Sequence, residues 1–227
     1  MTTLANKTTS ATKSTSATKS TSGTKTIASH ELPAKQLDPE VAAKRADKMK
    51  VSMISLCGCW GCTLSFLDTD ERLVGLLDKI TILRCSLTDI KRIPERCKIG
   101  FIEGGVANDD NIEVLKHFRE NCDILISVGA CAIWGGVPAM RNMVELGDCL
   151  TEAYTDSVTA VAGAKPVIPF HHNLPTLTNK VYPCHEVVKM DYFIPGCPPS
   201  ADSIFKVFDD LINGRPVDLP VSLHHYD

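Results

Sequence analysis

The sequence predicts an α/β domain with a central parallel sheet and helices on both of its faces. The first observation is a series of short apolar, β-branched runs that alternate with segments of helical periodicity. The second is that several of these runs end in glycine-containing turns. Strands that alternate with helices form parallel sheets through right-handed crossovers. Ligands of such sheets bind beyond the carboxyl ends of the strands, so the glycine turns are candidate binding loops.

Six runs are candidate strands, because each is short, apolar and bounded by polar or turn-forming residues. They cover residues 51–56, 80–84, 99–103, 124–128, 166–169 and 192–194.

Four segments between or after these runs are candidate helices, because their apolar residues recur at helical spacing. They cover 63–78, a segment capped within 109–111, a segment that begins near Pro138, and a segment from Ser200 or Asp202 to Gly214. In the first helix the residues at helical spacing are Leu64, Leu67, Val74 and Leu77.

Three regions differ in composition along the chain. Residues 1–30 contain a repeated Ser/Thr/Lys unit between residues 10 and 26 and no acidic residue. Such a segment cannot bury enough apolar surface to offset the entropy of ordering, so we expect a disordered extension. Residues 31–50 are expected to form a polar linker, and residues 51–227 a single domain.

Composition argues against two classes of partner. The chain has 24 Lys and Arg against 27 Asp and Glu, with no basic stripe that would indicate nucleic acid. No apolar run reaches the roughly 18–20 residues needed to cross a membrane. The first residues lack the apolar core of an export signal and a twin-arginine pair, so we expect a cytoplasmic protein. Its ten cysteines should therefore be thiols or metal ligands rather than disulfides.

The cysteine pattern indicates a cofactor site. The chain has one C-x-x-C, Cys59 to Cys62, and two solitary cysteines in glycine-containing turns, Cys131 and Cys197. Each of the three sites follows an apolar run, which predicts that they meet at one edge of the sheet. Four thiolates are the usual ligands of an iron–sulfur cluster. Cys62 also lies at a predicted helix N-terminus, where the helix dipole favours the thiolate.

Two other interpretations use fewer of these cysteines. Structural zinc sites commonly have two closely spaced ligand pairs, whereas this chain has one pair and two single cysteines. A thioredoxin-like dithiol would involve Cys59 and Cys62 alone. We favour the cluster over both, and we interpret the cysteines outside such turns as small apolar core residues: Cys85, Cys97, Cys122, Cys149 and Cys184.

Four further residues are expected to adjoin the ligands, because they lie in the same strand-end turns. They are Cys57, Trp60, Glu103 and Gly104. A glutamate at a strand end is usually a solvated cap. Beside a cluster, Glu103 could instead tune the reduction potential or relay protons.

With these residues in place, the chain resembles the small, electron-transferring subunit of [NiFe] hydrogenases, and within that group the small subunit of the cytoplasmic NAD-reducing type. Four blocks carry the resemblance in order: 57–71 (CGCWGCTLSFLDTDE), 102–105 (IEGG), 128–136 (VGACAIWGG) and 194–199 (IPGCPP). The Ser/Thr/Lys repeat lies outside it.

The resemblance implies a flavodoxin-like, three-layer domain with one [4Fe–4S] cluster held by Cys59, Cys62, Cys131 and Cys197. It implies a nickel–iron site on a large subunit and a diaphorase unit that carries flavin and further clusters. The complex would catalyse H2 + NAD⁺ = NADH + H⁺, with this chain relaying electrons and not catalytic alone. NAD is expected on a partner subunit, because no G-x-G-x-x-G follows a strand in this chain. The family has also been linked to FMN, which is a further candidate cofactor.

Two related alternatives share the predicted fold. The first is the cluster-bearing subunit of the quinone module of complex I, which has two adjacent cysteines at the first site. Here Gly58 separates Cys57 from Cys59. The second is a flavin-binding flavodoxin-like module, but the loop after the first strand carries cysteines where a flavodoxin has phosphate-binding hydroxyls.

Overall fold

The computed structural model describes residues 39–88, 90–159, 161, 163 and 165–224, so the predicted extension 1–30 lies outside the described residues. Its α-helices are α1 (Pro39–Ala46), α2 (Gly61–Leu67), α3 (Glu71–Lys79), α4 (Asp109–Asn121), α5 (Gly129–Trp134), α6 (Leu146–Tyr154) and α7 (Ala201–Ile212). Its strands are β1 (Met49–Ser55), β2 (Ile80–Arg84), β3 (Cys97–Glu103), β4 (Val106–Asn108), β5 (Cys122–Val128), β6 (Leu177–Tyr182) and β7 (Tyr192–Ile194). Short 3₁₀ helices are η1 (Val137–Met143), η2 (Cys184–Glu186) and η3 (Val221–Leu223).

The main sheet has the strand order β2-β1-β3-β5-β7, and every neighbouring pair is parallel. This is the strand order of flavodoxin-like folds, in which the order reverses at the first strand. The predicted fold class is therefore confirmed. Register aligns the strand ends, because Ser55 pairs with Glu103 and Glu103 with Val128. The loops that follow β1, β3 and β5 consequently begin side by side at the C-terminal ends of the strands.

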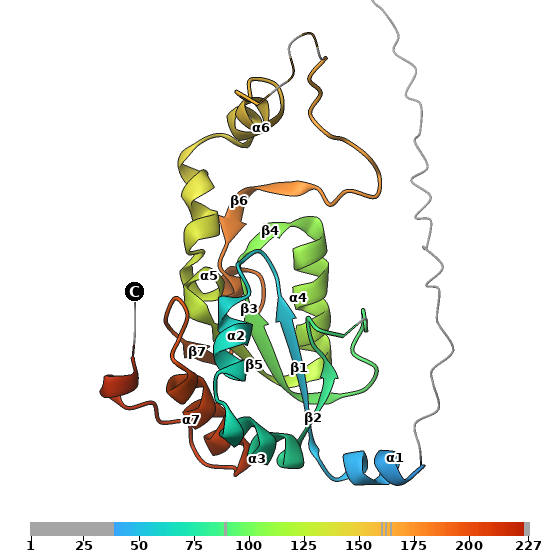
Figure 1. The fold of residues 1–227 in the computed structure, drawn as a ribbon, viewed down its shortest axis with the longest axis vertical. Helices are drawn as coiled ribbons and strands as arrows, with labels where there is room; N and C mark the ends of the chain where they lie inside the picture. The colour runs from blue at the N-terminus through green and yellow to red at the C-terminus, as the bar shows by residue number, and fades with distance from the viewer. Residues whose placement is uncertain (1–38, 89, 160, 162, 164, 225–227) are drawn as a thin grey trace, which may run out of the picture. The chain divides into compact units, whose positions relative to one another are not determined.

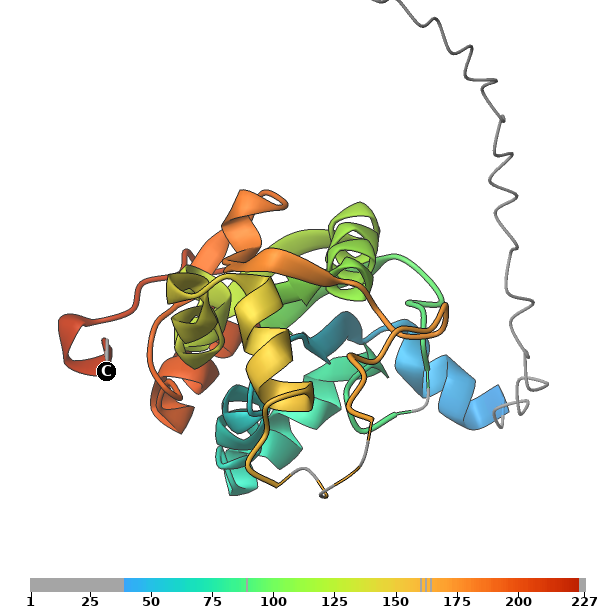
Figure 2. The ribbon, with the colours of Figure 1, turned by 90° about the horizontal axis from the view of Figure 1, so that it is seen from above.

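Helices cover both faces of this sheet, as Figures 1 and 2 show. On one face α2, α3 and α7 enclose a core in which Phe66, Phe101 and Phe208 pack with ring centroids 5.2–6.3 Å apart. On the other face α4 and α5 enclose a second core, where Leu115 and Phe118 of α4 are fully buried. In the middle of β5, for example, Ile124 and Ile126 face the first core and Leu125 faces the second, as the alternation of side chains along a strand requires.

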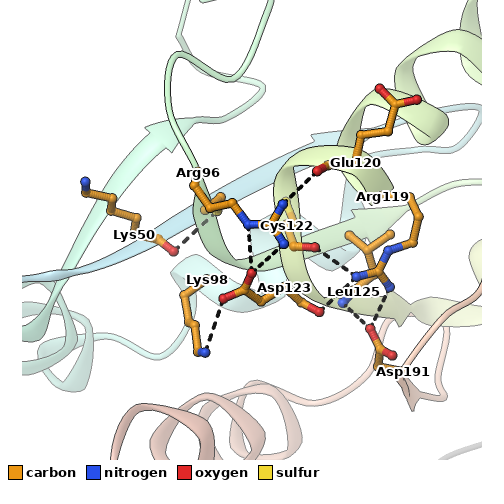
Figure 3. A network of polar contacts seen from close by, with 10 residues as sticks. Lys50, Arg96, Lys98, Arg119, Glu120, Cys122, Asp123, Leu125 and Asp191 are labelled. Atoms are coloured by element: carbon orange, nitrogen blue, oxygen red, sulfur yellow. Dashed lines mark hydrogen bonds and ion pairs between the residues drawn. The ribbon is translucent and has the colours of Figure 1, made fainter.

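A polar network joins α4 to the sheet near the N-terminal ends of β3 and β5 (Figure 3). Arg119 of α4 donates a hydrogen bond to the Asp191 carboxylate at 2.7 Å, and the Leu125 amide donates to the same oxygen at 2.8 Å. Lys98 pairs with Asp123 at 3.2 Å. Arg119 also donates to the carbonyl of Asp123, which joins α4 to β5. Charge-assisted hydrogen bonds of this kind stabilise the N-terminal ends of these strands, which lie opposite the loops that carry the cysteines.

The helix expected over 63–78 is two helices, α2 and α3, which is a correction to the sequence prediction. After α2 ends at Leu67, the Thr69 hydroxyl donates to the Phe66 carbonyl at 2.8 Å, and Asp70, with φ of +52°, directly precedes α3. The four residues at helical spacing, Leu64, Leu67, Val74 and Leu77, are exposed. Phe66 and Leu76 are buried instead, because they face the aromatic core.

The segment 166–169 is not a strand, which corrects a second expectation. Pro166 and Pro169 explain the difference, since a proline cannot donate to a strand ladder. The segment that begins near Pro138 forms the 3₁₀ helix η1 rather than an α-helix. The antiparallel pair β4–β6 was not expected. Within the predicted linker, residues 39–46 form α1. In the described part of the chain, no helix is both long and apolar enough to span a membrane.

Candidate functional site

The loop after β1 continues the pairing of the sheet and then turns sharply into α2. Cys57 and Gly105 exchange two backbone hydrogen bonds, at 2.9 Å and 2.8 Å, which hold the loops after β1 and β3 together. Gly104 has φ of +82°, and a Cβ atom there would lie 2.9 Å from the Cys57 backbone. Trp60 has φ of +68° and directly precedes α2. Cys59 therefore lies just before this turn, and Cys62 lies just after it, in the first turn of α2.

The two solitary cysteines lie beside this loop, in the segments that follow β5 and β7. Cys131 lies in the first turn of α5, and Cys197 follows β7 by three residues. The Ala130 amide donates to the Gly196 carbonyl at 2.8 Å, which joins the two turns. The Ser65 hydroxyl of α2 donates to the Pro199 carbonyl at 2.5 Å, which brings the third turn against the first.

The four candidate ligands therefore line one cavity. Cys59 and Cys197 are exposed, whereas Cys62 and Cys131 are half-buried. The residues that line the cavity are Gly58, Cys59, Gly61, Cys62, Glu103, Gly104, Ala130, Cys131, Gly196, Cys197 and Pro198. Of the four residues expected to adjoin the ligands, Glu103 and Gly104 line this cavity.

Glycines leave room for the sulfur atoms around the cavity. A Cβ atom at Gly129 would lie 2.3 Å from the Cys62 sulfur, and one at Gly136 would lie 2.9 Å from the Cys131 sulfur. At Gly61 the distance to the Cys59 sulfur would be 3.2 Å. Three of the four thiols thus sit against a backbone without a side chain. Because the sulfur atoms lie so close to the backbone, a larger residue at these glycine positions would clash with them.

Glu103 is 2% exposed, so the expectation of a solvated cap is wrong. Its two carboxylate oxygens accept hydrogen bonds from the Thr63 amide, at 3.0 Å, and the Thr63 hydroxyl, at 2.8 Å. Buried carboxylates require such partners. Thr63 is 4% exposed and was not singled out in the sequence, since a threonine after a cysteine carries no signal of this role.

Two thiols of the cavity, those of Cys62 and Cys131, have raised pKa values. Burial raises the pKa of Cys62, and the Glu103 carboxylate raises it further. Burial also raises the pKa of Cys131, followed by the proximity of Cys197 and Cys59. The helix dipole was expected to favour the Cys62 thiolate, but burial and Glu103 outweigh it.

The other cysteines lie elsewhere. Cys97, Cys122 and Cys184 are buried in the core that α4 and α5 cover. Cys85 packs at the edge of the opposite core. Cys149 is half-buried on α6 and belongs to neither core, which corrects its interpretation as a core residue. Within the residues that the structure describes, no three His, Cys, Asp or Glu side chains are grouped closely enough to hold a single metal ion.

Comparison with known proteins identifies a family for most of the chain. Residues 59–211 match the family described as the 20 kDa subunit of NADH ubiquinone oxidoreductase. The matched residues include all four cysteines that line the cavity.

Individual relatives are hydrogenase subunits. The chain is 73% identical over 201 residues to the delta subunit of the NAD-reducing hydrogenase HoxS of Cupriavidus necator, which covers 88% of this chain and 96% of that subunit. It is 35% identical to a subunit of the vhu F420-non-reducing hydrogenase of Methanococcus voltae, over 77% of this chain and 60% of that relative. A crystal structure of NAD⁺-reducing [NiFe]-hydrogenase in the H2-reduced state contains a chain that superposes with a TM-score of 0.76 at 42% identity, over 79% of this chain and 99% of that one.

Proposed function

Since the chain belongs to the family of the 20 kDa subunit of NADH ubiquinone oxidoreductase, and within it to the small subunits of NAD-reducing hydrogenases, we propose that it is the electron-transferring small subunit of such an enzyme. The observation that carries the proposal is the convergence of Cys59, Cys62, Cys131 and Cys197 on one cavity at the strand ends. Four cysteines on three turns at one end of a parallel sheet would form a preorganised binding site.

The cofactor proposed for this cavity is one [4Fe–4S] cluster, with these four cysteines as its ligands. Such a cluster supplies reversible one-electron transfer when it is bound. The glycine turns keep the sulfur atoms accessible from within the cavity, and Glu103 carries a carboxylate to its wall. The exposed Cys59 and Cys197 give the cavity an open side. A partner protein would have to cover that side to exclude water.

The partners proposed are a large subunit with the nickel–iron site and diaphorase subunits with flavin and further clusters. The complex would catalyse H2 + NAD⁺ = NADH + H⁺ in the cytoplasm, and this chain alone would not. Trp60 and Trp134, which are 41% and 45% exposed, are candidate anchors for the large subunit. Trp60 lies in the loop that carries Cys59 and Cys62, and Trp134 is the last residue of α5, which carries Cys131.

Two alternatives are less well supported. A quinone-module subunit of complex I shares the family, but the 73% identity is to a hydrogenase subunit, and Gly58 separates Cys57 from Cys59. FMN is a candidate cofactor of the family. In this chain, however, the loop after β1, where a flavodoxin-like domain would bind the FMN phosphate, carries Cys59 and Cys62. We therefore favour the hydrogenase assignment with one cluster.

The test is purification of the native complex through a tag on this chain. We expect a nickel-containing partner, labile sulfide, and an EPR signal of a reduced [4Fe–4S] cluster. Hydrogen-dependent reduction is then measured with NAD⁺, NADP⁺, a deazaflavin and a quinone side by side. Preference for NAD⁺ supports the proposal, and preference for quinone would support the complex I alternative. Tightly bound zinc without labile sulfide would end the cluster hypothesis.

A further inference from the structure

The segment 137–177 is here called the arm, and its described residues contribute to neither core. It leaves the sheet after α5, forms η1 and α6, and returns into β6 (Figure 1). No described residue between 136 and 180 is buried. Elsewhere in the domain, β-strands and helices bury apolar side chains against the sheet. The arm is therefore the largest part of the described chain without a core of its own.

The arm is nevertheless rich in large apolar side chains. Phe170 is 95% exposed, Met143 is 89% exposed and Val167 is 72% exposed. Leu146, Leu150 and Tyr154 recur at four-residue spacing along α6, which places them on one face of the helix. This face and the returning chain line an apolar groove, whose other walls include Ile168, Phe170 and Leu174. Apolar surface gathered in this way usually marks an interaction site.

The two ends of the arm are anchored beside the cysteine cavity. On the outgoing side, α5 carries Cys131, and Gly136 lies against the Cys131 sulfur. On the returning side, β6 pairs with β4, which follows Glu103 and the glycines of the cavity wall. Arg141 of η1 donates to the Thr178 carbonyl at 2.8 Å, so the two ends of the arm are also joined to each other. A protein that covers the open side of the cavity would meet the base of the arm.

We propose that the groove between α6 and residues 168–177 is a docking surface for the large subunit, which would insert apolar side chains into it. This inference rests on the proposed function, and it extends the interface from the cysteine turns to the arm. A nine-residue helix is marginal in water without tertiary packing. The large subunit is the partner that must reach the cavity, and the groove lies on the arm whose base adjoins that cavity. Its occupation would bury the apolar face of α6.

The test uses the complex purified through a tag on this chain, with two groove variants, Leu150→Asp and Phe170→Asp. Val74→Asp is the matched control, because Val74 is an apolar side chain of α3 that is 65% exposed and lies outside the arm. We expect each groove variant to reduce the recovered large subunit at least tenfold. The iron and sulfide content of the tagged chain should stay unchanged, since neither side chain belongs to a core. The control should retain the large subunit.

The outcomes separate this inference from the proposed function. If the unaltered chain brings down no nickel protein, the proposed function fails. If the unaltered chain and both groove variants bring it down equally, only the docking inference is overturned. Loss of the large subunit from Val74→Asp alone would overturn it in favour of the α2–α3 face. If the groove variants still bind the large subunit but no longer form a homodimer that the unaltered chain forms, the docking inference is overturned. The groove would then bind a second copy of the chain. Hydrogen exchange gives a second measure: amides of α6 should exchange slowly in the complex and fast in the separated chain.

Discussion

The sheet with its helices and the arm contain apolar residues of similar kinds but use them differently. In the sheet, apolar side chains alternate between two cores that the chain itself covers. In the arm, α6 has an apolar face of comparable regularity, but its Leu146 and Leu150 are only half-buried and its Tyr154 is exposed. The comparison teaches that an apolar face on a helix does not by itself show whether the same chain will bury it. The cysteine cavity lies where the two regions meet.

The first prediction contrasts a cysteine of the cavity with a cysteine of the arm. Cys62→Ser should abolish cluster binding, because it removes a proposed ligand that is wedged against Gly129. Cys149→Ser should leave iron and sulfide unchanged, because Cys149 lies on α6 outside the cavity. Iron analysis and EPR of the reduced complex measure both. Equal loss in the two variants would mean that the arm and the cavity are not independent.

The second prediction compares burial in the two regions. Phe208→Ala should lower the free energy of unfolding by about 3–5 kcal/mol, because Phe208 is fully buried against Phe66 and Phe101. Tyr154→Ala should change it by less than about 0.5 kcal/mol, because Tyr154 is 48% exposed on α6. Denaturant titrations of the separated chain measure both values. A large loss in Tyr154→Ala would show that the arm packs in solution.

The sequence was sufficient for the features that depend on local rules. Strand-end turns with glycine and cysteine were predictable, because the ends of parallel strands meet at one edge and the cysteines follow directly. The helix α7 was predictable as well, with the Ser200 hydroxyl accepting from the Ser203 amide as its cap.

Other features depend on contacts between distant residues. Leu64, Leu67, Val74 and Leu77 have helical spacing, yet contacts of Phe66 with Phe101 and Phe208 select the opposite face for burial. Burial of Glu103 depends on Thr63, which is 40 residues away in sequence. No periodicity in a single segment can indicate such a pairing. The arm is the extreme case, since the surface that would bury it lies outside this chain under the proposal above.

The third prediction concerns the edge of the sheet opposite the cavity. Although burial alone raises the pKa of Asp191, the Arg119 guanidinium and the Leu125 amide lower it below the ordinary value. A depressed pKa in the folded state means that Asp191 stabilises the protein above its unfolded pKa and loses this effect as the pH falls.

Asp191→Asn should therefore destabilise the chain by about 1 kcal/mol at pH 7, a modest value because the pair is partly exposed. The difference from the unaltered chain should narrow as the pH falls from about 5 to 3. Unfolding titrations at several pH values check it, with Asp110→Asn, an exposed carboxylate at the start of α4, as the control. A difference independent of pH would contradict the assignment to the Asp191 charge.

The last prediction applies the comparison to the start of the chain. Residues 1–28 contain no aromatic residue and no acidic residue, and threonine, serine and lysine dominate them. Such a composition offers little apolar surface to bury, in contrast to the arm, so we expect no contribution to a core or to an apolar contact of useful area. Deletion of residues 1–28 should leave the iron content, the yield of the complex and the hydrogen-dependent reduction of NAD⁺ unchanged within error. The full-length complex, prepared in parallel, is the reference. A fall of several-fold in activity with the cluster intact would give the Ser/Thr/Lys repeat a role that its composition does not predict.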